Sequence, residues 1–172
     1  FQDKDIVEPQ RIYEMEDIIK ICQLYMEIME DWLDAPTKQE RRCFILEKKR
    51  PRFDLDKSKD IKTDDEGNKK VKDGVHIMFP YITTNTYLQL VFRKTILEAV
   101  DTILNKYNFE NTYGDIFDRC VIDKNNWQMY GSGKSKSSQV YTVTKIIEIY
   151  KDSAVDISEL LINEYTNKVL FT

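Results

Sequence analysis

Apolar residues recur at helical spacing in two long segments of the chain. Over residues 13–33 they lie three and four positions apart, which predicts an amphipathic helix that ends at Pro36. A second helix is predicted over residues 86–107, with Asn85 among its candidate caps. The segment "SELLINEYTNKVL", which begins at Ser158, predicts a third helix.

Compact or alternating apolar runs between these helices predict β-strands. Strands are expected in "RRCFILEK" (41–48), "GVHIMFPYI" (74–82) and "QVYTVTKIIEIY" (139–150). We also expect a strand in "DIFDRCVID" (115–123), where a short helical turn is an alternative, and a short β segment in "NWQMYGS" (126–132). The order of elements predicts an α+β fold, with helices packed on a mostly antiparallel sheet.

Length, charge and cysteine content limit the possible classes of protein. A chain of 172 residues fits one domain. A net charge of −4 excludes a surface that is basic throughout, so any contact with nucleic acid must use a local basic patch. The cysteines form no CxxC pair and the chain holds a single histidine, which excludes a zinc site built from them. They are typical of reduced intracellular thiols. No apolar run approaches the roughly 20 residues of a membrane span.

A strongly charged segment, residues 48–72, connects two of the predicted strands. It predicts a mobile, solvated hairpin connection. Asp54 and Asp56 would share one face if this segment were a strand, and could then share a divalent ion. The neighbouring cations, Arg52 and Lys57 among them, favour a solvated loop instead.

The single histidine, His76, lies in the predicted strand that returns from this connection. Alternation places Val75 and Ile77 on one face and His76 on the other. Gly74 removes a side chain where another group must approach closely, and Lys72 adds a positive charge nearby. Taken alone, a single histidine of this kind is more often structural than a phosphate ligand.

The loop "YGSGKSKSS" (130–138) combines glycines with Lys134 and Lys136. Such a loop can direct backbone N–H groups and positive charge at an anion. It is not a nucleotide P-loop, because Gln128 stands where the first glycine of that motif belongs. A hairpin turn with solubilising lysines is the alternative.

Asp118 stands among apolar neighbours in residues 115–123. A carboxylate that projects from a sheet into a cleft is a common ligand of hard metal ions, and a buried one needs a cation or a donor. The alternative is a turn or a helix cap at the end of the sheet.

In their order along the chain, these motifs resemble the archaeo-eukaryotic primase superfamily. The similarity is greatest to the primase portion of the primase–helicases of large nucleocytoplasmic DNA viruses. Gly74-Val75-His76 matches the small-x-His motif, Phe117-Asp118 the hydrophobic-Asp motif, and "NWQMYGSGK" (126–134) the last motif of the family. Gln128 departs from the arginine of PrimPol-like members. The DxD or DxE pair of the first motif would directly precede Phe1, so we expect residues 1–172 to be a catalytic core without its first motif strand.

The resemblance implies template-directed nucleotidyl transfer for primer synthesis in viral DNA replication, by a mechanism with two Mg²⁺ or Mn²⁺ ions. Asp118 would be a catalytic metal ligand. His76, which would also be catalytic, would bind the nucleoside triphosphate together with Lys72, Ser132 and Lys134. The implied partners are a single-stranded DNA template and a helicase domain in the same longer chain, at a viral replication site in the host cytoplasm or nucleus. Without the first motif, we expect the fragment itself to be inactive.

Two alternatives remain open. The chain would otherwise be a non-catalytic single-strand-binding module of primase-like shape, or a phosphate-binding enzyme of another class that uses the 131–136 loop. Basic residues of the connection would supply a surface for a template strand, although a solvated hairpin tip explains them equally well. These residues are Lys48, Lys49, Arg50, Arg52, Lys69 and Lys70.

Overall fold

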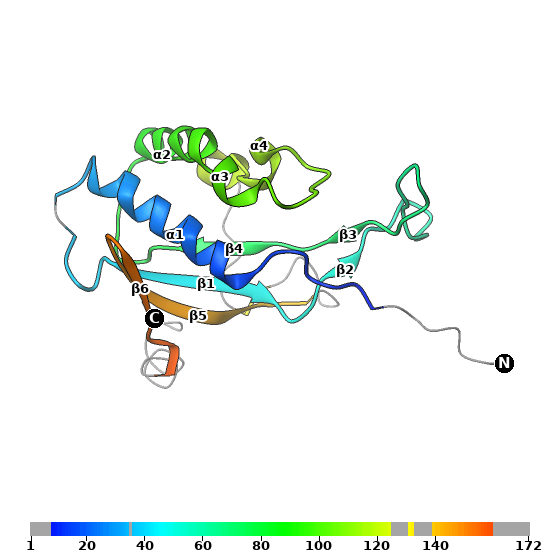
Figure 1. Cartoon of the computed structure of the whole chain (residues 1–172), viewed down its shortest axis with the longest axis horizontal. Helices are drawn as coiled ribbons and strands as arrows, with labels where there is room; N and C mark the ends of the chain where they lie inside the picture. The colour runs from blue at the N-terminus through cyan, green and yellow to red at the C-terminus, as the bar shows by residue number, and fades with distance from the viewer. Residues whose placement is uncertain (1–7, 35, 125–130, 133–138, 160–172) are drawn as a thin grey trace.

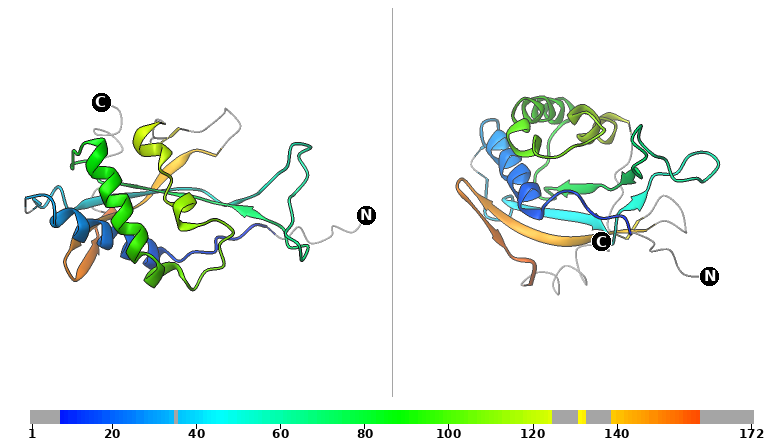
Figure 2. Two further views of the ribbon diagram at one scale, coloured as in Figure 1. Left: turned by 90° about the horizontal axis from the view of Figure 1, so that it is seen from above. Right: turned by 45° about the vertical axis from the view of Figure 1, so that its right-hand side comes forward.

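The computed structural model describes residues 8–34, 36–124, 131–132 and 139–159. An antiparallel four-stranded sheet in the order β4-β1-β5-β6 forms one layer, and the helices cover one of its faces (Figure 1). The right-hand view of Figure 2 shows the same division into a helix layer and a sheet. The predicted α+β architecture is therefore confirmed.

The central strand of the sheet is β1, which pairs antiparallel with both β4 and β5. The strands of this sheet are β1 (Arg42–Lys48), β4 (Val75–Met78), β5 (Tyr141–Tyr150) and β6 (Ser153–Asp156). The sequence did not predict β6, which lies directly before the segment that predicted the third helix. The predicted C-terminal helix lies almost wholly outside the described residues.

Two of the predicted helices are present in shortened form. The helices are α1 (Met15–Glu30), α2 (Thr86–Ala99), α3 (Asp101–Leu104), α4 (Tyr113–Ile116) and α5 (Cys120–Asp123). Asn85 caps α2 as expected, because its side chain accepts a hydrogen bond from the backbone N–H of Leu88 at 2.9 Å. The predicted 86–107 helix is divided near Val100 into α2 and α3.

The strand predicted in residues 115–123 is wrong, and the structure favours the helical alternative, because this segment contains the end of α4, a short link and α5. Thr112 and Asp115 form a capping box that starts α4. The carboxylate of Asp118 accepts the backbone N–H of Cys120 at 2.8 Å, at the start of α5. These short-range side-chain hydrogen bonds favour helical turns over an extended chain, which explains the difference.

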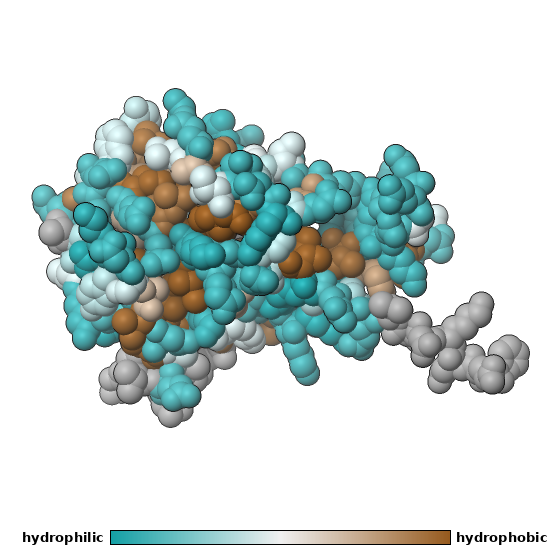
Figure 3. All heavy atoms as spheres, in the orientation of Figure 1, coloured by the Kyte–Doolittle hydropathy of each residue, from teal (hydrophilic) through white to brown (hydrophobic). Residues whose placement is uncertain are grey.

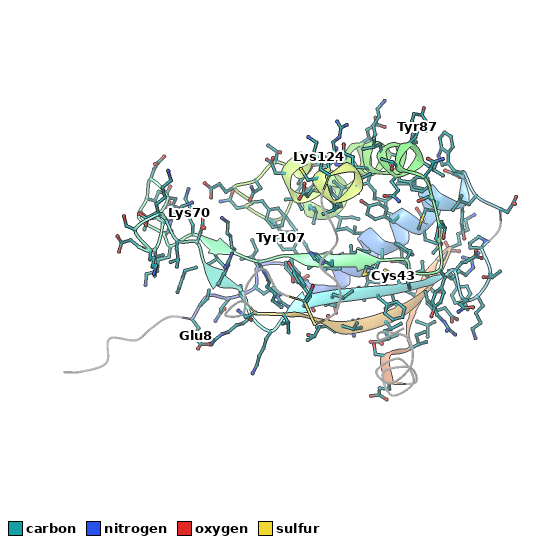
Figure 4. The ribbon with its side chains drawn as sticks, turned by 180° about the vertical axis from the view of Figure 1, so that it is seen from behind. Glu8, Cys43, Lys70, Tyr87, Tyr107 and Lys124 are labelled. Carbon is teal, nitrogen blue, oxygen red and sulfur yellow. The ribbon has the colours of Figure 1, made fainter. Side chains whose placement is uncertain are left out.

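Side chains on both faces of β1 are buried, because residues 43–47 are all buried and successive side chains of a strand point in opposite directions. The face toward the helices meets α1 and α2 through Cys43, Ile45, Ile147 and Ile149. Figure 4 labels Cys43 where β1 meets the helix layer. The opposite face, here called the second face, carries Phe44, Leu46, Tyr141, Ile146 and Ile157. Among the helices that the structure describes, none has the length and apolar character to span a membrane.

The charged connection projects from the body as a hairpin with short paired strands, β2 (Arg52–Phe53) and β3 (Val71–Lys72) (Figure 1). Backbone hydrogen bonds join Asp54, Lys62 and Lys70 in a closed ring, with N···O distances of 2.8–2.9 Å. Between these positions, the carboxylates of Asp56 and Asp64 each accept two backbone N–H groups and so hold two tight lobes. The predicted mobility of the connection stays a prediction.

Candidate functional site

The imidazole of His76 is stacked on the phenol ring of Tyr141. The ring centroids are 3.8 Å apart and the ring planes differ by 18°. His76 lies opposite Leu46 in the register of β4 and β1, so it points to the second face, while Val75 and Ile77 pack against the helix-side core. The predicted alternation of this strand is therefore confirmed.

Tyr141 reaches His76 from β5, across the central strand. Lys48 of β1 is the register partner of Tyr141, and its ammonium lies 4.9 Å from the centroid of the phenol ring. A Cβ atom added to Gly74 would lie 3.4 Å from the Tyr141 hydroxyl oxygen. The close approach that Gly74 predicted is thus made in the structure by a tyrosine of the chain itself.

The first part of the Gly/Ser/Lys loop is hydrogen-bonded to the backbone of Tyr141. The backbone N–H of Gly131 donates to the carbonyl of Tyr141 at 2.9 Å, and the N–H of Tyr141 donates to the carbonyl of Ser132 at 3.3 Å. Two of the predicted phosphate-binding residues, His76 and Ser132, therefore contact one tyrosine. Lys134 lies outside the described residues.

Lys72 is held in the hairpin by an ion pair. Its ammonium lies 2.9 Å from one carboxylate oxygen of Asp54, and that of Lys62 lies 2.9 Å from the other. The hydrogen bonds from Lys72 and Lys62 lower the pKa of Asp54 to about 2. Asp54 therefore stabilises the hairpin through ion pairs with Lys62 and Lys72, which favours the solvated loop over a divalent ion shared with Asp56.

Asp118 lies in the helix layer, between α4 and α5. The preceding residue, Phe117, packs against the helix-side core, and its ring centroid is 6.3 Å from that of Tyr25. Arg93 of α2 fixes this turn by donating to the carbonyl of Phe117 at 2.6 Å. The exposed side chain of Asp118 is on the helix side of the sheet and the imidazole of His76 is on the second face. A single site that contains both residues stays a prediction.

Residues 1–147 match the family model described as "C962R protein N-terminal AEP domain", where AEP stands for archaeo-eukaryotic primase. The chain belongs to this family. The superfamily inferred from the sequence motifs is therefore confirmed for this AEP domain.

A curated relative is "Putative helicase L207/L206" of Acanthamoeba polyphaga mimivirus. It is 29% identical to the AEP domain over 148 residues, which are 83% of this chain and 14% of the relative. The chain thus spans about one seventh of the length of that relative. No solved structure matches the chain.

A buried ionic cluster in the AEP domain fixes the turn that leads into His76. Glu47 of β1 is 2% exposed and accepts hydrogen bonds from Arg11, from Tyr13 at 2.8 Å and from Thr144 at 2.5 Å. Arg11 also donates to Asp73 at 2.8 Å, directly before Gly74-Val75-His76. Burial and the hydrogen bond to Glu47 raise the pKa of Tyr13, so this phenol stays protonated. Sequence reasoning missed this cluster, whose members come from four separate segments.

The basic residues of the hairpin are partly neutralised by neighbouring carboxylates. Arg50 pairs with Glu8 at 3.3 Å, and Lys70 pairs with Glu110. Figure 3 shows the hairpin surface as mostly hydrophilic, and Figure 4 labels Lys70 on it. The predicted surface for a template strand is therefore of mixed charge around Arg50 and Lys70.

Metal ligands are sparse within the ranges that the structure describes. No group of three or more His, Cys, Asp or Glu side chains there is arranged to hold a metal ion. Asp118, an exposed carboxylate, is one suitable oxygen ligand. The described residues therefore do not form a complete metal site.

Proposed function

We propose that this AEP domain is the primase portion of a viral primase–helicase, and that the longer protein synthesises primers by template-directed nucleotidyl transfer. The match of residues 1–147 to the AEP family supports the primase part. The mimivirus relative, whose name is that of a helicase, supports the helicase part and a role in viral replication. Single-stranded DNA would be the template, and the basic positions of the hairpin its first contacts.

The observation that carries the nucleotide site is the meeting of His76 and Ser132 at Tyr141. An imidazole N–H and a hydroxyl are hydrogen-bond donors to phosphate oxygens, and a protonated imidazole adds a positive charge. Lys134, two residues beyond Ser132, would add a further cation. These three residues would bind the triphosphate of the incoming nucleotide, on the second face of the sheet.

Lys72 would bind the triphosphate only after its ion pair with Asp54 is broken. A nucleoside triphosphate carries several negative charges, whereas Asp54 offers one, so the phosphate competes well for the ammonium. In the absence of nucleotide, Asp54 keeps Lys72 at the base of the hairpin.

Asp118 would be a ligand of Mg²⁺ or Mn²⁺. Bound divalent ions would supply activation of the 3′-hydroxyl and stabilisation of the leaving pyrophosphate. The remaining ligands would come from residues outside the described ranges. Because Asp118 and His76 lie on opposite sides of the sheet, the two residues need separate tests.

Primer synthesis by the longer protein that contains this domain tests the proposal. Asp118→Asn should abolish primer synthesis and leave the affinity for single-stranded DNA unchanged. Asp123→Asn is the matched control, because it removes a nearby carboxylate that pairs with Arg119 at 3.1 Å. Wild-type synthesis by Asp118→Asn would refute its role as a metal ligand.

A non-catalytic module that binds single-stranded nucleic acid is the second candidate. The observation that favours it is the separation of Asp118 from His76 by the sheet. This alternative predicts DNA binding that needs neither nucleotide nor metal, and a longer protein that makes no primers under any metal condition.

A further inference from the structure

We propose that Tyr141 is the positioning residue of the nucleotide site, because it orients the imidazole of His76 and anchors the segment of Ser132. The proposal rests on the proposed function of those two residues in phosphate binding. It adds a residue that belongs to none of the recognised motifs. Tyr141 would act through its neighbours rather than by touching the nucleotide.

The stack determines how the imidazole can meet a ligand. With the phenol ring parallel to it at 3.8 Å, one face of the imidazole is covered. The two ring nitrogens lie on the edge of the imidazole, so the stack keeps them in a fixed plane. Such fixed orientation lowers the cost of ordering a binding group when the ligand arrives.

Tyr141 is itself held from several sides. The side chain is 7% exposed, and its hydroxyl occupies the space that Gly74 leaves. Its backbone pairs with Lys48 in β1 and with the Gly131-Ser132 segment. Burial raises the pKa of the phenol, which therefore stays neutral beside the imidazole. A ring fixed in this way can orient a neighbour.

The same ring brings Lys48 to the site. The ammonium of Lys48 and the imidazole of His76 both lie against the Tyr141 ring, at 4.9 and 3.8 Å from its centroid. An aromatic ring attracts cations through its electron-rich face. Tyr141 thus gathers two groups that can carry positive charge where the Ser132 segment begins, as an anion site requires.

The chain contains one histidine, which makes the orientation of His76 directly measurable. A stacked aromatic ring shifts the imidazole proton resonances upfield, and no other histidine contributes to that region of the spectrum. We would record these resonances for the 172-residue chain and measure its affinity for ATP with MgCl₂ by calorimetry. The variants are Tyr141→Phe and Tyr141→Leu, with Tyr25→Leu as a matched loss of a tyrosine on the helix side.

Tyr141→Phe should keep both the upfield shift and the ATP affinity, because the ring remains. Tyr141→Leu should lose the shift and weaken ATP binding about fivefold, in line with the strength of an aromatic stack. Tyr25→Leu should lower the melting temperature but leave the shift and the affinity unchanged. If Tyr141→Leu does not fold, Tyr141→Met replaces it as the variant without the ring.

A double-mutant cycle separates this inference from the function on which it rests. If Tyr141 acts through His76, the loss of ATP affinity caused by Tyr141→Leu should be smaller in the His76→Ala background than in the wild type, where the small remainder reflects the contact of the ring with Lys48. Additive losses, or an unchanged affinity of Tyr141→Leu while His76→Ala binds weakly, would overturn the positioning role alone. If His76→Ala binds ATP as tightly as the wild type, the proposed nucleotide site itself is wrong.

Discussion

Asp17 is the buried carboxylate that connects α1 to the end of the second helical segment, and its replacement by asparagine is a sharp test of the fold. The side chain is 1% exposed. It lies 2.7 Å from the ammonium of Lys106 and 2.9 Å from that of Lys20, and it accepts a hydrogen bond from the Tyr107 hydroxyl. Asp17→Asn keeps the shape but removes the charge and presents an amide N–H₂ to these donors.

The magnitude follows from how these partners are placed. The carboxylate itself is buried, but the ammonium side chains of Lys20 and Lys106 are 57% and 45% exposed. Their ion pairs are therefore screened by solvent and contribute little. The hydrogen bond from Tyr107 to a charged acceptor is more sheltered, so we expect Asp17→Asn to cost about 2 kcal/mol of unfolding free energy. In a domain of this size, that lowers the melting temperature by about 4–8 °C.

The pH dependence has a defined sign. Hydrogen bonds from Lys106 and Tyr107 hold the pKa of Asp17 well below its usual value of about 3.9. Because the pKa of Asp17 is lower in the folded state than in the unfolded state, its carboxylate stabilises the fold at pH values above the unfolded-state pKa. This stabilisation is lost as the pH falls toward the folded-state pKa. The pKa of Lys106 is raised, so its contribution is complete below about pH 10. The difference between wild type and variant should be constant from about pH 5 to 10 and shrink below about pH 4.

Urea unfolding of wild type and Asp17→Asn, followed by circular dichroism at several pH values, measures this difference. Glu14→Gln is the control, because Glu14 pairs with the same Lys106 at 3.0 Å but is 66% exposed. The control should unfold like the wild type. The reasoning is refuted if Asp17→Asn also does so at pH 7, or if its deficit stays the same at pH 3.

Two further predictions concern the buried side chains of β1 and their neighbours. Arg11→Met should destabilise the domain by about 1–3 kcal/mol in urea unfolding, because it leaves the buried carboxylate of Glu47 without its cation. The control is Arg50→Met, which breaks only the exposed ion pair with Glu8 and should have no measurable effect on unfolding. Burial raises the pKa of the Cys43 thiol, so a water-soluble thiol reagent should modify Cys120 in the folded protein and Cys43 only after unfolding, as followed by mass spectrometry. Rapid labelling of Cys43 without denaturant would contradict the described core.

Local patterns of the sequence determined the elements and their faces. Helical spacing identified α1 and most of the second helical segment, and the cap at Asn85 followed from residue type. Alternation alone was enough to place His76 on the face opposite to Val75 and Ile77. These features depend on contacts within a few residues, which a single sequence displays directly.

Only the tertiary structure decided which distant residues meet. Tyr141 reaches His76 across β1, and Arg11 reaches Asp73 across 62 positions of sequence, because strand register and chain path bring them together. Neither contact leaves a periodic trace in the sequence. The segment around Asp118 is a different case, because local hydrogen bonds, the Thr112–Asp115 capping box and the bond from the Cys120 N–H to Asp118, outweigh the apolar run that predicted a strand. Periodicity thus fixed which side of each element is buried, while the partners across the sheet depended on how the strands align.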